Sequence, residues 1–118
     1  MSYVTAFMTA VPEQNKARYI EMARKSWDLF ADFGALEMTE CWEDNVPEGK
    51  VTSFPMAVKR EAGEKVVVSW IRWPDRAAAD KCFASMESDP RWQEMGEMPF
   101  DGMRMMWGGF EPIFEAKA

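Results

Sequence analysis

Two strand–helix–strand patterns follow one another along the chain, and this order constrains the fold more than any other feature. The six elements are expected at residues 2–11, 15–33, 35–43, 65–73, 76–87 and 103–114. Two such units in series form a four-stranded antiparallel sheet with both helices on one face. The sequence therefore predicts a ferredoxin-like α+β fold with the order βαββαβ, in one domain over residues 1–118.

The first helix carries end signals and a clear apolar stripe. Asn15 is a favoured N-cap residue, and Gly34 stands where a glycine commonly ends a helix. Between them, apolar residues recur at steps of three and four: Ile20, Ala23, Trp27 and Phe30. This stripe is expected to pack on the sheet.

A sheet with both helices on one side leaves its other face bare. In the first, third and fourth strands, neither alternating set of side chains is charged enough to face water, and Trp70, Trp73 and Trp107 need a cover. Large exposed apolar patches mark interfaces, and the sheet of a second copy is the simplest cover. The sequence therefore predicts a symmetric homodimer, a dimeric α/β barrel.

The charge balance and hydropathy narrow the classes of partner. The formal net charge is −6, and the cations are scattered, whereas a nucleic-acid binder needs a basic stripe to replace counterions on phosphates. No stretch approaches the roughly 20 apolar residues of a membrane span, and the N-terminal residues alternate as in a strand. We therefore expect neither nucleic acid nor a membrane as a partner.

The two cysteines give information about the cellular compartment and not about a reaction. Cys41 and Cys82 lack the spacing of a metal site and any secretory context. They are expected to be free thiols in a reducing cytoplasm. We expect no metal and no cofactor.

Histidine is absent from the chain, which removes histidine-based acid–base catalysis and the triads that depend on it. Glu40 is then the candidate catalytic residue, because alternation places it on the same strand face as Met38 and Trp42. Desolvation of a carboxylate on an apolar face raises its pKa into a useful range. The alternative is a structural ion pair of Glu40 with Arg72 or Arg104.

Candidate ligand-binding residues come from the aromatic strands and from one arginine: Trp42, Trp70, Arg104 and Trp107. A guanidinium at position 104 suits an anionic or carbonyl-bearing ligand. The methionines around it suit an irregular apolar pocket. Packing in the core or in the dimer explains the same aromatic and methionine residues without any ligand.

Residues 44–63 form a long irregular excursion between two strands. Loops of this length in compact domains are usually functional or disordered. Val51, Phe54 and Val58 supply apolar side chains, and Pro55 restricts the backbone, so we expect an ordered arm with a short extra strand at 52–59. Its role is left open between a lid over a ligand and a clasp on the dimer partner.

Four stretches give the chain a family resemblance: "SYV", "ECWEDNVPEGKVTSFPMAVK", "VVVSWIRWP" and "MPFDGMRMMWGGF". Together they resemble the bacterial family of domain-of-unknown-function 1428, the YbaA-like proteins, over nearly the whole chain. The resemblance implies the dimeric α/β-barrel superfamily, which includes cofactor-independent monooxygenases, haem-degrading enzymes, isomerases and plain binding proteins. The family implies no established reaction and supplies no catalytic residues.

Two functional hypotheses follow. In the first, a cytoplasmic homodimer binds a small apolar or aromatic metabolite in its barrel and acts as a cofactor-independent monooxygenase or isomerase. In the second, the same barrel is a non-catalytic ligand-binding or stress-associated module. The missing histidine disfavours haem degradation, and the sequence leaves open whether the chain is an enzyme.

Overall fold

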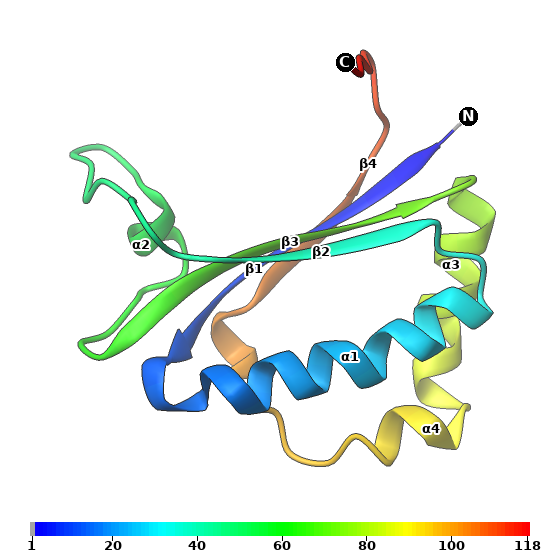
Figure 1. Ribbon diagram of the computed structural model, residues 1–118, viewed down its shortest axis with the longest axis horizontal. Coiled ribbons are helices and arrows are strands. Elements are labelled where there is room, and N and C mark those ends of the chain that lie inside the picture. Colours follow the sequence, from blue (N-terminus) through cyan, green and yellow to red (C-terminus); the bar gives the residue numbers. More distant parts are fainter. Residues whose placement is uncertain (1) are drawn as a thin grey trace.

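The computed structural model describes residues 2–118, which contain a four-stranded antiparallel sheet with the strand order β2-β3-β1-β4 (Figure 1). The central strands β1 (Tyr3–Pro12) and β3 (Glu64–Trp73) pair along their full length. Strand β2 (Glu37–Trp42) pairs with β3, and β4 (Met106–Phe110) pairs with β1. This is the ferredoxin-like α+β fold that the sequence predicts.

The main helices lie on one face of the sheet. They are α1 (Lys16–Asp32), α3 (Arg76–Ala84) and the short α4 (Pro90–Gln93). Figure 1 shows α1 and α4 on one side of the sheet and the small helix α2 on the other. Single 3-10 turns at Glu13–Asn15, Ser85–Glu87 and Gly102–Arg104 connect these elements.

Local end signals set most element boundaries, with two exceptions. The carboxylate of Asp75 accepts a hydrogen bond from the Ala78 N–H at 2.8 Å and caps α3. Asn15 is the N-cap residue of α1, as expected, but its side chain does not cap the helix, because its amide donates to the Pro99 carbonyl at 2.9 Å. The last strand begins later than expected, because Asp101 accepts from the Met103 N–H at 2.9 Å and starts a 3-10 turn there, and it also ends earlier, at Phe110.

The core lies between the sheet and the helices. Trp73 on β3 is fully buried, and its indole N–H donates to the Thr5 hydroxyl at 3.1 Å. The Phe30 ring of α1 meets this indole edge-on, with ring centroids 6.1 Å apart. Cys82 on α3 is also buried in this cluster, which ties both long helices to the same strand.

The other face of the sheet is covered at one end. Residues 52–59 do not form the expected strand; Phe54–Ala57 is helix α2, capped by the Ser53 hydroxyl, which accepts from the Met56 N–H at 3.1 Å. Pro55 fits the first turn of this helix, where its missing N–H is harmless. Val58 then packs on Ala10 and Val66, and all three side chains are buried.

The rest of that face carries exposed apolar side chains. Trp70, Met106 and Phe110 are 37%, 43% and 57% exposed. These residues come from β3 and β4, on the side opposite the core. Among the described residues, no helix is both long and apolar enough to cross a membrane.

Candidate functional site

An apolar cavity of about 220 Å³ lies between the sheet and the helices, and we refer to it as the Glu40 cavity. Aromatic and methionine side chains form most of its wall: Phe7, Phe30, Trp92, Phe100, Met22, Met38, Met86, Met98 and Met105. The polar groups in the wall are few, and they come from Thr9, Tyr19, Ser26, Glu40 and Ser69. An apolar cleft with a small number of convergent polar groups is the usual form of a small-molecule site.

The strand pattern explains why a carboxylate points into this cavity. Side chains alternate along β2, so Met38, Glu40 and Trp42 share the face that the helices cover. Glu40 stands opposite Ser69 of β3 in the strand register. On the helix side of the sheet, Tyr19 of α1 donates its hydroxyl hydrogen to Glu40 Oε1 at 2.7 Å.

Burial dominates the electrostatics of Glu40. Loss of solvent around the half-buried carboxylate raises its pKa above 4.5, and the Tyr19 and Ser69 hydroxyl groups offset part of that rise. Burial and the neighbouring Glu40 charge also raise the pKa of Tyr19, so Tyr19 stays a hydrogen-bond donor. Glu40 alone carries a carboxylate among the described side chains of the cavity wall.

The alternative of an ion pair between Glu40 and an arginine is wrong. Arg72 approaches Glu37 instead, with Nε 3.3 Å from Oε1, on the other face of the sheet. Arg104 forms a bidentate pair with Glu64, in which both N–O distances are 2.7 Å. Glu40 is instead held by the Tyr19 hydroxyl group, which donates to Oε1.

The four predicted ligand-binding residues do not line the Glu40 cavity in the described part of the chain. Trp42 shares the face of Glu40 but packs under the Lys16 ammonium, 5.3 Å from the ring centroid. Trp70 lies on the opposite face of the sheet, and Arg104 is tied to Glu64 beside the arm. Trp107 stacks on an α3 side chain at the sheet edge.

Sequence reasoning missed Tyr19, the closest partner of Glu40. The apolar stripe predicted on α1 includes Ile20, which is 48% exposed, whereas the neighbouring Tyr19 is 6% exposed. Tyr19 lies four residues before the buried Ala23, and this spacing was the available sign of the true helix face. A tyrosine ring is apolar with a polar tip, so hydropathy alone undervalues it.

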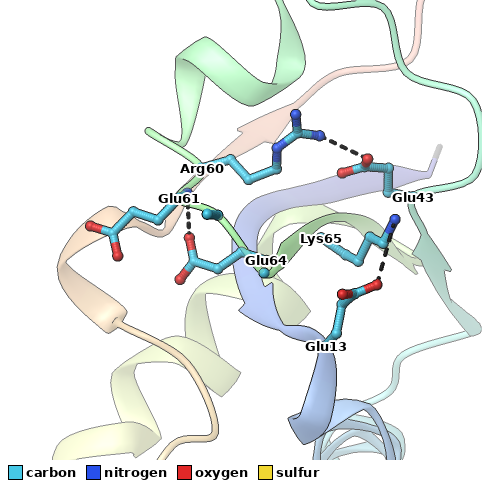
Figure 2. Close-up of a pocket in the computed structure, with 8 residues that line it drawn as sticks. Glu13, Glu43, Arg60, Glu61, Glu64 and Lys65 are labelled. Atoms are coloured by element: carbon cyan, nitrogen blue, oxygen red, sulfur yellow. Dashed lines mark hydrogen bonds and ion pairs between the residues drawn. The ribbon is translucent and has the colours of Figure 1, made fainter.

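A second hollow lies beside the arm and has a different character (Figure 2). Charged groups line it and satisfy one another: Arg60 pairs with Glu43 at 2.7 Å, and Lys65 lies 3.7 Å from Glu13. The Arg60–Glu43 pair fastens the arm to the end of β2, and Arg60 also reaches Glu48 within the arm at 2.6 Å. We therefore interpret the hollow as a structural contact between the arm and the strands.

Metal-binding side chains do not gather anywhere in residues 2–118. Within that range, no group of three or more cysteine, aspartate or glutamate residues is placed to hold a metal ion. In the described wall of the Glu40 cavity, the carboxylate of Glu40 and the hydroxyl groups of Thr9, Tyr19, Ser26 and Ser69 are set among apolar side chains.

Comparison with known proteins shows the family to which the chain belongs. The family model described as a protein of unknown function (DUF1428) matches residues 2–102. The uncharacterized protein YbaA of Escherichia coli strain K12 is 53% identical over 116 residues, which cover 98% of this chain and 99% of the relative. The uncharacterized protein YbaA of Shigella flexneri has the same identity and coverage. The family resemblance noted from the sequence is confirmed.

Solved structures with the same fold are more distant in sequence. A mutant of SnoaB, a cofactor-independent oxygenase from Streptomyces nogalater, superposes with a TM-score of 0.61 and 12% identity, covering 97% of this chain and 95% of its own. A dimeric ferredoxin-like protein from an uncultured marine organism gives a TM-score of 0.58 and 14% identity, covering 98% and 100%. At these identities the likeness shows the fold alone.

Proposed function

The chain belongs to the family described as a protein of unknown function (DUF1428), and from that premise we propose that it binds a small apolar or aromatic metabolite in the Glu40 cavity and removes a proton from it. One observation carries the proposal: a half-buried carboxylate held by a tyrosine hydroxyl faces a wall of aromatic and methionine side chains. A carboxylate with a raised pKa in a cleft is the usual sign of a proton-transfer group.

We assign separate roles to the two side chains. Tyr19 donates to Glu40 Oε1 and fixes the orientation of the carboxylate, whose other oxygen, Oε2, would accept the ligand proton. Burial raises the pKa of Glu40, so its conjugate acid is weak enough for the carboxylate to take a proton from a moderately acidic ligand. A proton on an enol or phenol oxygen, or on a carbon beside a carbonyl group, meets that requirement.

Proton removal of this kind begins two reactions that need no cofactor. The electron pair of the broken O–H or C–H bond spreads into the carbonyl group of the ligand as an enolate. Return of the proton to another carbon completes an isomerisation. Addition of molecular oxygen to the enolate carbon, with uptake of a proton, forms a hydroperoxide, and loss of water from it leaves a new carbonyl group on that carbon, which is a monooxygenase reaction. The geometry of Glu40 supports the shared first step.

Non-catalytic ligand binding is the second candidate, and the composition of the cavity favours it. Among the described residues of the wall, Glu40 is the one carboxylate, and burial and the Glu40 charge raise the pKa of Tyr19 well above its usual value. A single carboxylate suffices to recognise a ligand hydroxyl group by hydrogen bonding. Turnover separates the two candidates.

Deuterium exchange into 2-tetralone, a small bicyclic ketone with acidic hydrogens beside its carbonyl, tests the proposed proton transfer. In D2O, the wild-type protein should accelerate exchange at least tenfold over Glu40→Gln at equal concentration, as read by mass spectrometry. Tyr19→Phe should give an intermediate rate, because the carboxylate remains but its orientation is lost. Equal rates with wild type and Glu40→Gln would leave only the binding function.

The same proposal includes a homodimer that covers the exposed sheet face. Apolar side chains of β3 and β4 remain exposed there, and one structural neighbour is described as dimeric. Beyond β4 the chain projects away from the sheet (Figure 1), and Ile113 and Phe114 are 96% and 83% exposed. A second copy, placed sheet to sheet, would bury both sets of side chains.

The arm at 44–63 is proposed as a clasp on this partner. Val58 anchors the arm to the sheet, while Phe54 and Met56 of α2 stay exposed beside the open face. Of the described residues that line the Glu40 cavity, none comes from 44–63, which favours the clasp over the lid. Cys41 and Cys82 are free thiols in the described chain, which supports a cytoplasmic location.

A further inference from the structure

One polar group in the Glu40 cavity has no role in the proposal above. Thr9 of β1 lines this cavity and is 2% exposed, yet its hydroxyl group has no hydrogen-bond partner among residues 2–118. An unsatisfied buried hydroxyl costs about 1–3 kcal/mol, and valine has nearly the same shape. Packing therefore does not explain a threonine at this position.

The strand register fixes how Thr9 lies relative to Glu40. Glu40 and Phe7 stand opposite Ser69 from its two sides, and Thr9 is the next residue after Phe7 on the same face of β1. The two positions are thus two strands apart and offset by two residues. Strand spacings of about 4.8 Å and residue rises of about 3.3 Å place their Cα atoms about 12 Å apart.

We propose that Thr9 is a second anchor in the Glu40 cavity and that the ligand carries a carbonyl oxygen across one ring from the hydroxyl group that meets Glu40. This inference rests on the proposed function. The side chains of Thr9 and Glu40 and their hydrogen bonds to the ligand span part of the distance between the two Cα atoms. A single ring with para substituents spans the remainder. The substrate class is a conjugated hydroxycarbonyl compound, such as a phenol or enol conjugated to a ketone.

The chemistry of this class connects the two ends of the cavity. When the ligand O–H bond breaks, the proton goes to the Glu40 carboxylate, and the electron pair moves through the conjugated system toward the carbonyl oxygen. Negative charge then develops where the Thr9 hydroxyl donates a hydrogen bond. A donor aimed at developing charge in a dry site stabilises the ionised form more than the neutral form. Thr9 is therefore a positioning and charge-stabilising residue.

Two phenols of nearly equal shape test the inference. 4-Hydroxyacetophenone carries the para carbonyl group, and 4-isopropylphenol replaces its oxygen with a methyl group. Calorimetry should show that Thr9→Val weakens binding of the ketone about tenfold and leaves binding of 4-isopropylphenol unchanged. Thr9→Ser should retain the affinity for the ketone, because it keeps the hydroxyl group. Absorbance titration should show a higher pKa of the bound ketone in Thr9→Val than in wild type.

The outcomes separate this inference from the proposed function. If both phenols bind and Glu40→Gln weakens both, but Thr9→Val affects them equally or not at all, the second anchor is wrong and the proposed function stands. If neither phenol binds wild type, the proposed function and the second anchor are both overturned. Thermal unfolding controls for folding, since Thr9→Val loses an unpaired hydroxyl and should be at least as stable as wild type.

Discussion

The two faces of the sheet reverse the usual distribution of polar and apolar side chains. The face under the helices buries polar groups among its apolar residues, including Thr5, Thr9 and Ser69, which are at most 3% exposed. The opposite face leaves Trp70 and Phe110 substantially exposed. Burial of polar groups is unfavourable unless they are paired, and exposure of large aromatic groups is unfavourable unless they are later covered. These two distributions support the proposals that the first face binds a ligand and that the second contacts a partner.

Covering by the arm divides the open face further. At the arm end, Val58 seals Ala10 and Val66, and the three side chains are buried within one chain. At the other end, Trp70 is 37% exposed. The side chains under the helices thus form a buried core, whereas on the opposite face burial is confined to the arm end.

Trp73→Ala tests the finished core and should have the largest effect. Its fully buried indole contacts Phe30 and donates to Thr5, so truncation leaves a large cavity and an unpaired hydroxyl. We expect the free energy of unfolding to fall by about 3–5 kcal/mol. Urea denaturation measures the loss, and a loss below about 1 kcal/mol would mean that this face is not the core.

Trp70→Glu tests the open face. A charge at the centre of the proposed sheet-to-sheet contact should weaken the dimer by at least about 100-fold, because the carboxylate would be buried without a partner. Sedimentation velocity at micromolar concentration should show a dimer for wild type and a monomer for the variant. Ile20→Glu is the matched control, since Ile20 is also exposed, at 48% against 37% for Trp70, but lies on α1. A monomeric wild-type protein would refute the dimer.

Val58→Ala tests the contact between the arm and the sheet. Removing two methyl groups from a side chain that is 1% exposed should lower the free energy of unfolding by about 1–3 kcal/mol. Val51→Ala is the control, because Val51 is 96% exposed and should change stability by less than about 0.5 kcal/mol. Equal effects of the two substitutions would show that the arm does not pack on the sheet.

The free energies of unfolding of Glu40→Gln and Glu43→Gln should depend on pH in opposite ways, and this is the smallest effect that we expect. Burial raises the pKa of Glu40, so the wild-type carboxyl group opposes folding increasingly as the pH rises through that raised value. Burial acts in the same direction on Glu43, but the Val66 N–H and Arg60 outweigh it and lower the pKa. Glu43 therefore stabilises the fold above pH 4.5, and this contribution disappears as the pH falls through the lowered value.

Denaturation at pH 4 and pH 8 compares the two variants with wild type. Relative to wild type, Glu40→Gln should gain stability from pH 4 to pH 8, whereas Glu43→Gln should lose stability over the same range. The same sign for both variants would contradict the assignment of one carboxylate to a ligand cavity and the other to a structural ion pair.

Local patterns predicted the elements because their causes are local. The apolar residues of β3 and the Asp75 cap of α3 act over a few residues, and both elements begin within one residue of the predicted position. The last strand was predicted too long because Asp101 captures the Met103 N–H and Arg104 pairs with Glu64. The second of these contacts joins residues 40 positions apart, which no local pattern contains.

The candidate site was predicted only in part for the same reason. Strand alternation placed Glu40 on an apolar face without any knowledge of the tertiary structure. Its partner Tyr19 is 21 residues away on another element, and only the docking of α1 on the sheet brings the two together. The unpaired hydroxyl of Thr9 is likewise a property of the packed cavity, since threonine is common in strands.

Fluorescence of bound 2-naphthol tests the central claim most directly, that Glu40 accepts a proton from a ligand in the apolar cavity. 2-Naphthol is a much stronger acid when excited, and its neutral and ionised forms emit at different wavelengths. At pH 8, wild type should bind the probe saturably and show naphtholate emission, because Glu40 takes the proton. Glu40→Gln should bind it more weakly and emit mainly as neutral naphthol. Identical emission from the two proteins, or no saturable binding by wild type, would contradict the account.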